Sequence, residues 1–276
     1  MLRSLKDLDR YKLAATDGPI GPVVNFLLDD KHWTVRYLVV ETGSTFDGRK
    51  VLISPNAFRE VDWSTLQFHV SLSAEKIRSS PNVDTDRPVS RELERDFSQY
   101  YEYLPYWEYS ELLGSGSNAS QIVGALPLRS LENPPQSKPE GHLRSAKELR
   151  GYHVQGTDEA LGHVADFIVD DKTWEIKYLV VDTRDWWFGK KVLIAPQWTS
   201  QISWENRTID VCVSRDFVAK SPEWDVNAPV NREYEVRLYD YHGRPAYWAT
   251  KEAHDAVPEP MPASAKLPFH PPSIPG

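Results

Sequence analysis

The chain contains an internal repeat with a period of 141 residues. At this offset residues 2–107 align with residues 143–248 without a gap, and about 40 of the 106 aligned pairs are identical. The longest matches include Asp29-Asp30-Lys31 with Asp170-Asp171-Lys172, Tyr37-Leu38-Val39-Val40 with Tyr178-Leu179-Val180-Val181, and Lys50-Val51-Leu52-Ile53 with Lys191-Val192-Leu193-Ile194. A repeat this long is a complete domain, whereas solenoid repeats are shorter and must stack to be stable. We therefore expect two copies of one domain, each with its own core and able to fold alone.

The segments outside the repeat have the composition of linkers and tails. Residues 110–119 are rich in glycine and serine, residues 133–139 are rich in proline, and seven prolines lie between Pro258 and Pro275. Proline lacks the backbone N–H that helices and strands need, so such segments do not pack as regular elements. We predict a first domain over 1–109, a flexible linker over 110–141, a second domain over 142–248 and a disordered tail over 249–276.

Short strands separated by turn residues precede residue 72 in the first copy and residue 213 in the second, which is typical of a small barrel or sandwich. The segment 35–42 is apolar on both faces in its middle, so we expect it to be the most buried strand. Phe68, Val70 and Leu72 alternate with polar residues and predict a half-buried final strand. Serine-capped helices are expected over 73–79 and 90–100.

The same alternation predicts which polar side chains point outward. Asn25 and its counterpart Asp166 are expected to face water, as is the side chain of Cys212. The acidic pair Asp29-Asp30, repeated as Asp170-Asp171, reads as a hairpin turn. Neighbouring residues of a turn point apart into solvent, so we interpret these carboxylates as structural rather than as a catalytic pair.

Composition narrows the classes of partner. Forty acidic residues against 32 basic ones give a net charge of −8, and the two kinds are interspersed along the chain. Nucleic-acid binding requires a concentrated positive surface, so we expect no nucleic-acid partner. Apolar runs are far shorter than the roughly 20 residues of a membrane helix, and charge follows Met1 closely. We expect no membrane insertion and a cytoplasmic location.

The residues that usually carry catalysis or bind metals are scattered. Cys212 is the single cysteine and is aligned with a serine, and the eight histidines form no ligand spacing. Asn82-x-Asp84-x-Asp86 resembles the start of a calcium loop, but Arg87 and Leu93 stand where such a loop needs glycine and glutamate. No glycine-rich phosphate loop is present. We predict no catalytic residues, no metal site and no cofactor.

Aromatic residues supply the best candidate site. Three tryptophan positions recur in both copies, which predicts structural roles; they are Trp33/Trp174, Trp63/Trp204 and Trp107/Trp248. Trp186-Trp187-Phe188, by contrast, occupies a hairpin loop whose counterpart is Thr45-Phe46-Asp47. Exposed loop aromatics are typical interface anchors, so we predict that this loop binds a protein; the alternative is that the rings cover one end of the domain or the other copy.

The repeated motifs resemble the PRC-barrel domain. The resemblance rests on Leu2-x-Ser4-x-x-x-Leu8, Thr157-Asp158-x-x-Leu161-Gly162-x-Val164-x-Asp166-Phe167, Tyr178-Leu179-Val180-Val181-Asp182-Thr183, Lys191-Val192-Leu193-Ile194-x-Pro196 and Pro229-Val230-x-Arg232-Glu233. It covers both copies and implies a mainly β fold of two tandem small barrels, each followed by short helices. Family members include the cytoplasmic barrel of the photosynthetic reaction-centre H subunit and the C-terminal barrel of a ribosome maturation factor.

In those two proteins the barrel is a docking module without catalytic activity. The resemblance therefore implies a non-enzymatic, protein-binding function, and stand-alone members are loosely described as stress-response proteins. Two alternatives remain open: an accessory or assembly protein of a photosynthetic or electron-transport complex, and an enzyme with a site at the seam between the copies. The partner protein is unknown, and homo-oligomer formation is left open.

Overall fold

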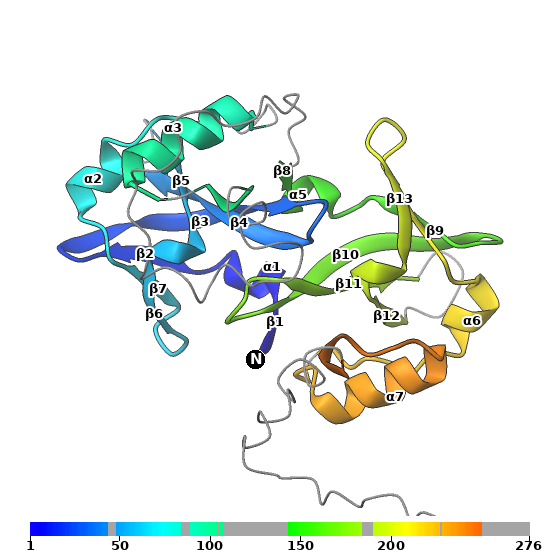
Figure 1. Cartoon of the computed structure of the whole chain (residues 1–276). Coiled ribbons are helices and arrows are strands. Elements are labelled where there is room, and N and C mark those ends of the chain that lie inside the picture. Colours follow the sequence, from blue (N-terminus) through cyan, green and yellow to red (C-terminus); the bar gives the residue numbers. More distant parts are fainter. Residues whose placement is uncertain are drawn as a thin grey trace, which may run out of the picture. The chain divides into compact units, whose positions relative to one another are not determined.

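The computed structural model describes residues 1–43, 48–83, 89–103, 105–107, 143–183, 190–226 and 228–249 (Figure 1). The chain divides into two compact units, Met1–Asn231 and a second that begins at Arg232. The first unit holds both β-sheets and the other described helices, and the mainly β fold predicted from the sequence is confirmed. Helix α7, Arg232–His242, belongs to the second unit.

The first copy supplies one run of strands and helices. Its elements are β1 (Leu2–Ser4), α1 (Leu5–Leu8), β2 (Lys12–Ala15), β3 (Gly18–Asp29), β4 (Thr34–Thr42), β5 (Arg49–Ile53), η1 (Pro55–Ala57), β6 (Phe58–Asp62), β7 (Gln67–Val70), α2 (Ala74–Arg78) and α3 (Arg91–Tyr101). The second copy repeats this order. Its elements in the first unit are β8 (Leu143–Ser145), α5 (Ala146–Leu149), β9 (His153–Gln155), β10 (Ala160–Asp170), β11 (Ile176–Asp182), β12 (Lys191–Ile194), η3 (Pro196–Trp198), β13 (Thr199–Ser203), β14 (Thr208–Val211) and α6 (Arg215–Ala219).

Two seven-stranded sheets result from these elements. One has the order β5-β4-β3-β2-β7-β6, the other β12-β11-β10-β9-β14-β13, and each carries one further strand. Neighbouring strands are antiparallel except for the parallel pairs β2–β7 and β9–β14. Among the described strands no pairing joins the two ends of either sheet, so these sheets are not closed into the barrels expected from the sequence.

The core lies along the central strands, as the apolar pattern predicts. Leu38, Val39 and Val40 in the middle of β4 are fully buried. The inward alternation of the last strand is also confirmed, with Phe68 and Val70 buried. Cys212 is exposed, as expected.

The predicted serine caps are present as well. Ser73 accepts a hydrogen bond from the N–H of Lys76 at the start of α2, and Ser90 does so from Leu93 at the start of α3. Along the described part of the chain no helix is long and apolar enough to span a membrane. The predicted linker and all but the first residue of the predicted tail lie outside the described residues, so the domain boundaries stay a prediction.

The expectation that each copy has a core of its own is wrong, because the copies exchange their N-terminal strands; folding of one copy alone stays a prediction. Strand β1 of the first copy pairs with β10 of the second, and β8 of the second copy pairs with β3 of the first (Figure 1). The registers are equivalent, since Leu2 stands opposite Asp170 and Leu143 opposite Asp29. We call the segments 2–8 and 143–149, each a strand and a short helix, the arms of the two copies. Each sheet therefore contains one strand of the other copy.

The hydrophobic core is shared in the same reciprocal way. Trp174 lies 6.5 Å from Phe26 of the first copy between ring centres, and Trp33 lies 6.5 Å from Phe167 of the second. Both tryptophans are buried and occupy the left-handed region, with φ of 60° and 49°. Backbone hydrogen bonds join the same turns. The N–H of Val35 donates to the carbonyl of Trp174, and the N–H of Ile176 donates to the carbonyl of Trp33. The structural role predicted for this tryptophan pair is confirmed, but the rings close the opposite copy.

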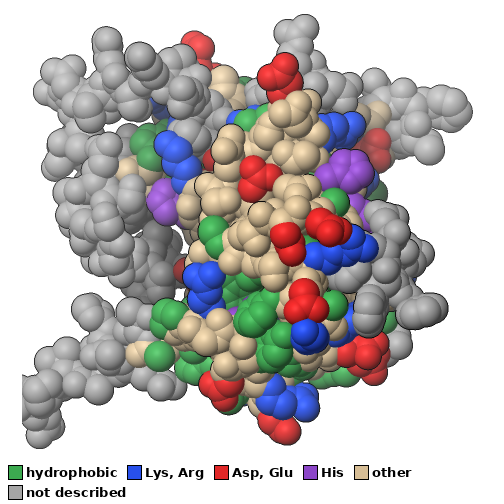
Figure 2. Space-filling model, turned by 90° about the vertical axis from the view of Figure 1, so that its right-hand side faces the viewer, with side chains coloured by type: hydrophobic (Ala, Val, Ile, Leu, Met, Phe, Trp, Pro, Cys, Tyr) green, Lys and Arg blue, Asp and Glu red, His purple; other side chains and the backbone are tan. Residues whose placement is uncertain are grey.

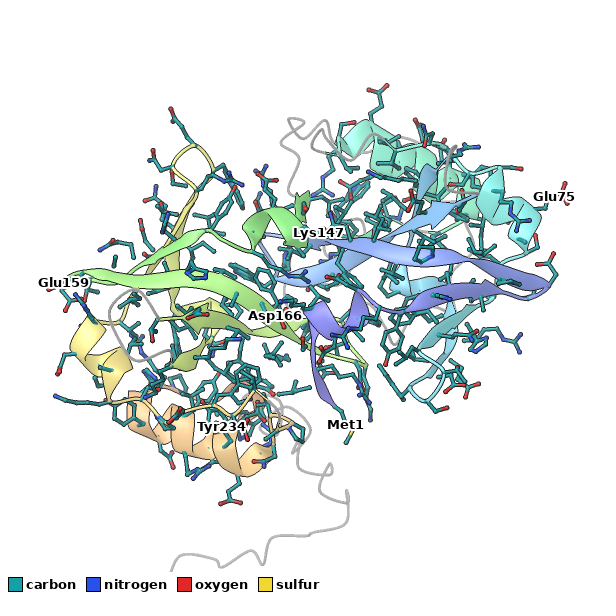
Figure 3. All side chains as sticks on the ribbon, turned by 180° about the vertical axis from the view of Figure 1, so that it is seen from behind. Met1, Glu75, Lys147, Glu159, Asp166 and Tyr234 are labelled. Atoms are coloured by element: carbon teal, nitrogen blue, oxygen red, sulfur yellow. The ribbon has the colours of Figure 1, made fainter. Side chains whose placement is uncertain are left out.

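Two polar positions predicted to face water are buried beneath the arms. Asp166, which is labelled in Figure 3, is 8% exposed. It accepts hydrogen bonds from the Ser4 hydroxyl at 2.5 Å and the Lys6 N–H at 3.0 Å. Asn25 holds the other arm through Ser145 and the N–H of Lys147. The strand alternation does direct these side chains away from their own core. The outward face, however, is covered by the arm of the other copy.

The prediction that the carboxylates of the acidic turns point into solvent is also wrong. Asp30 pairs with Arg144 at 3.1 Å and Asp171 with Arg3 at 2.9 Å, so each turn binds the arm of the other copy. Asp29 is 1% exposed and accepts hydrogen bonds within its own turn. Asp30 and Asp171 do not point freely into solvent, because the opposite copy supplies their cations, and Asp29 is paired with Arg36 and His32 of its own copy.

Candidate functional site

A cavity of about 470 Å³ lies at the seam between the two copies, within the first unit. The first copy lines it with β4, η1, β6, α3 and the segment after α3, and the second copy contributes the turn 171–174. Because this turn of the second copy forms part of its wall, the cavity depends on both copies being folded.

Aromatic rings form the apolar part of the wall. Phe58 stacks on Phe68 with 5.0 Å between ring centres, and Trp174 meets Phe58 edge-on at 5.2 Å. Paired aromatic rings of this kind contribute about 0.5–1.5 kcal/mol each beyond the burial of their area. The wall on this side is therefore part of the shared core and is held rigidly in place.

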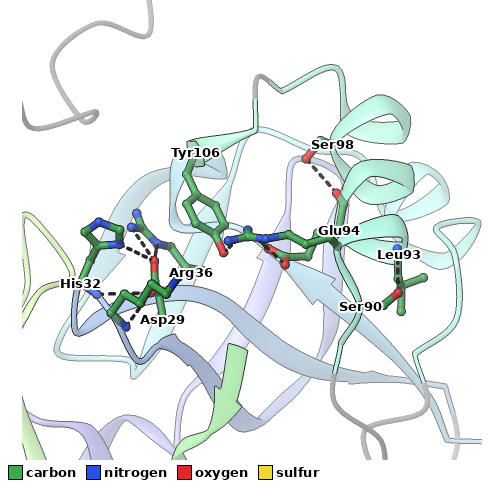
Figure 4. Close-up of polar contacts among 10 residues, drawn as sticks. Asp29, His32, Arg36, Ser90, Leu93, Glu94, Ser98 and Tyr106 are labelled. Carbon is green, nitrogen blue, oxygen red and sulfur yellow. Dashed lines mark hydrogen bonds and ion pairs between the residues drawn. The ribbon is translucent and has the colours of Figure 1, made fainter. Parts of the chain in front are cut away.

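A chain of polar side chains runs from Asp29 to Glu94, and two of its members, Arg36 and Tyr106, line the cavity (Figure 4). The carboxylate of Asp29 pairs with Arg36 at 3.0 Å, and the Arg36 guanidinium stacks over the Tyr106 ring at 4.0 Å. The Tyr106 hydroxyl accepts a hydrogen bond of 2.7 Å from Arg91, which also pairs with Glu94 at 3.3 Å. Each charged member thus faces a partner of opposite charge or an aromatic ring.

The electrostatics of this chain differ at its two ends. Burial alone would raise the pKa of Asp29, but Arg36 and His32 outweigh burial and lower the pKa below its usual value. Glu94 is fully buried, and burial raises the pKa of its carboxyl to about 7 against the opposing effect of Arg91. Glu94 does not line the cavity; Tyr37, Ser98 and Tyr106 do. Its unusual pKa therefore belongs to a group that is covered by protein.

We expect the stability of the protein to depend on pH through Glu94. A carboxyl whose folded pKa is raised stabilises the fold below its unfolded pKa of about 4.5, and this contribution is lost as pH rises through the folded value near 7. The substitution Glu94→Gln should remove this loss, which is roughly 3 kcal/mol for a shift of this size. Thermal melts between pH 5 and pH 8 should show the variant gaining on the parent as pH rises. Glu92→Gln, an exposed change on the same helix, should run parallel to the parent; a parallel course for Glu94→Gln would contradict the assignment.

Two exposed basic side chains stand at the rim of the cavity, one from each copy. Arg59 belongs to β6 of the first copy, and Lys172 belongs to the turn 171–174 of the second copy. Glu60 is exposed beside them. On the face shown in Figure 2, acidic and basic side chains are interspersed, which agrees with the mixed charge pattern of the sequence. The cavity thus has exposed charges at its rim and aromatic rings in its interior.

The sequence-predicted site does not coincide with this cavity. Trp186, Trp187 and Phe188 lie outside the described residues, so the loop hypothesis stays a prediction. Asp84 and Asp86 of the segment that resembles a calcium loop also lie outside the described residues. In the described part of the chain, no three His, Cys, Asp or Glu side chains are grouped so as to hold a metal ion. The predicted absence of cofactors and catalytic groups is not tested by these observations.

Sequence reasoning missed the residues that join the copies. Arg3, Ser4, Arg144 and Ser145 bind the opposite copy, and Arg3 also stacks over Trp63 at 3.4 Å. Leu-Arg-Ser opens both copies in identical form, and this was the available signal. A short polar segment at a domain start has no strong apolar pattern, so periodicity alone does not assign it to a sheet.

The fold and site define a duplicated, mainly β protein whose halves are joined by exchanged arms and share a cavity at their seam. Comparison with known families adds that residues 142–216 match the PRC-barrel domain. This match lies in the second copy and covers β8 through the start of α6. No curated protein matches the chain. The relation of the first copy to that family rests on the internal repeat.

Proposed function

We propose that the chain is a protein-docking or assembly module built of two PRC-type barrel domains, without catalytic activity of its own. The PRC-barrel match in the second copy supports an interaction module. The observation that carries the proposal is the seam cavity, which combines a rigid aromatic wall with exposed charges from both copies. Interface anchors are typically aromatic side chains in such pockets, surrounded by a polar rim.

A segment of the second copy, the turn 171–174, already packs against this part of the first copy. The turn of the second copy inserts Trp174 against Phe58 and Phe68, while Lys172 of the same turn remains exposed. A partner segment would extend this packing with an apolar or aromatic side chain and meet Arg59 and Lys172 at the rim. Acidic residues beside the inserted side chain would complement these two cations.

The alternative of an enzyme at the seam draws on the raised pKa of Glu94, since such shifts cluster at active sites. A general acid must lie within hydrogen-bond reach of its substrate. Glu94 is fully buried behind the cavity wall and paired with Arg91, so this geometry favours a structural ion pair. The narrower roles in stress response or in photosynthetic and electron-transport complexes rest on the resemblance alone.

Affinity purification with rim variants tests the docking proposal. The double variant Arg59→Glu/Lys172→Glu should reduce recovery of specific partners at least about tenfold, because it reverses both rim charges without touching the core. The repeat provides a matched control: Lys31 is the counterpart of Lys172 in the first copy and is also exposed, so Lys31→Glu should leave recovery unchanged.

A third variant separates the cavity from the loop predicted from the sequence. If the partner is lost with Trp186→Ala/Trp187→Ala and retained with the rim variant, the loop is the docking site and the cavity is not. Partners recovered equally with all variants would contradict docking at either place. A product formed by the purified chain, lost on Glu94→Gln, would favour the enzyme.

A further inference from the structure

The contacts between the two copies occur in pairs related by the repeat. The arm pairings β1–β10 and β8–β3 have equivalent registers. Polar contacts repeat in the same way: Arg3 with Asp171 corresponds to Arg144 with Asp30, and Ser4 with Asp166 to Ser145 with Asn25. Contacts that exchange in this manner define an approximate two-fold axis between the copies, as in a symmetric dimer.

A residue on a two-fold axis meets its own counterpart. Two such pairs occur among the residues that the structure describes. Thr34 forms an isolated antiparallel bridge with Glu175, its equivalent at the offset of 141. Asp9 and Arg150, which follow the two arm helices and are equivalent as well, form an ion pair of 2.6 Å between Oδ2 and a guanidinium nitrogen. Their side chains are only 22% and 15% exposed.

These axial positions distinguish the possible pairings of copies. Where the copies are alike, an arm fits either kind of copy equally well. A pairing of two first copies, however, would place Asp9 against Asp9, and a pairing of two second copies would place Arg150 against Arg150 and Glu175 against Glu175. Like charges repel at such contacts, and partial burial weakens screening by salt.

Pairing of unlike copies gains at the same positions. Arg150 reaches Asp9 and also lies 3.9 Å from Asp166, the buried carboxylate that holds the first arm. One guanidinium thus serves two carboxylates next to the axis, and no such cation stands at position 9 of the first copy.

We propose that the arm-binding face of each copy recognises an unlike copy, so that a first copy pairs with a second copy. Asp9 and Arg150 determine this choice of partner. The arm contacts supply the binding, and the axial charges supply the specificity. The unlike copy normally comes from the same chain. The same face fits the unlike copy of a second chain when the charges within a chain no longer match.

The experiment uses two full-length variants. The chain with Asp9→Arg carries two arginines at the axis, and the chain with Arg150→Asp carries two aspartates, so within either chain the axial charges are alike. Between the two chains every axial contact joins opposite charges. The chains are given different tags, unfolded, refolded together in equal amounts and measured by native mass spectrometry. We expect a mixed dimer that exceeds either like-chain dimer by at least about tenfold, the change produced by about 1.4 kcal/mol.

The control replaces the first variant by Asp7→Arg, an exposed charge reversal on the same arm helix. Mixed with the Arg150→Asp chain, it should give no excess of mixed dimer. Each single variant should melt roughly 5 °C below the parent. The double variant Asp9→Arg/Arg150→Asp restores opposite charges at the axis within one chain, so it should melt above both single variants, although it still lacks the contact between Arg150 and Asp166.

If a single variant does not refold, the double variant decides the question. A double variant that folds where the single ones fail supports the proposal. Mixed and like-chain dimers in statistical proportions, or a double variant as unstable as the single ones, would overturn it.

Discussion

Replacing Leu179 with Asp is expected to unfold both copies, although the change lies in the second. Leu179 is fully buried in the middle of β11, between Phe167 of β10 and Ile194 of β12. An aspartate there would bury an unpaired charge, which costs roughly 4 kcal/mol or more. Strand β10 also holds the arm of the first copy, and the neighbouring turn supplies Trp174 to its core. Loss of β11 should therefore remove support from the first copy as well.

Hydrogen exchange followed by mass spectrometry checks this result, because it reports on each copy separately. Peptides from β4 in the first copy should lose protection together with those from β11. Gln201→Asp, an exposed change on β13 of the same sheet, should leave both copies protected. Retained protection in β4 of the Leu179→Asp chain would show that the copies are independent after all.

Removing the Trp174 side chain should have the second largest effect. The ring is 6% exposed and packs against Phe26, Phe58 and Phe68 of the other copy. Replacing a buried tryptophan with alanine costs about 3–5 kcal/mol, since the site cannot collapse fully. For a protein of this size we expect the melting temperature to fall by roughly 10 °C.

The repeat again supplies comparison variants. Trp33→Ala removes the reciprocal ring and should cost a similar amount, whereas Trp204→Ala should cost less, because that ring is less buried and stacks on Arg144 at 3.9 Å. A loss of less than about 1 kcal/mol for Trp174→Ala, measured by chemical denaturation, would contradict the shared core.

The sequence was sufficient for the elements but not for their partners. The buried strand around Leu38, the final strand with Phe68 and the serine-capped helices follow from local periodicity, and the structure confirms them. The exchange of arms cannot be read in this way. The copies are alike, so β1 satisfies the same hydrogen-bonding pattern on β3 of its own copy as on β10 of the other.

The errors at polar positions have the same origin. Asn25 and Asp166 do point away from their own cores, as alternation predicts. Solvent exposure is a property of the whole assembly, and the other copy covers this face. The cavity was likewise invisible, because its wall combines Phe58 with Trp174, residues more than a hundred positions apart in the sequence. The aromatic loop at Trp186 remains a prediction.

The seam cavity has a consequence for stoichiometry. In a dimer of identical chains, symmetry forces every surface feature to occur twice, and a substitution at one site alters both. In this chain the two halves are encoded separately, and they already differ where Ser98 of the cavity aligns with Tyr239. Duplication within one gene thus allows the two halves to change independently, so symmetry does not fix the number of binding sites at two for each polypeptide.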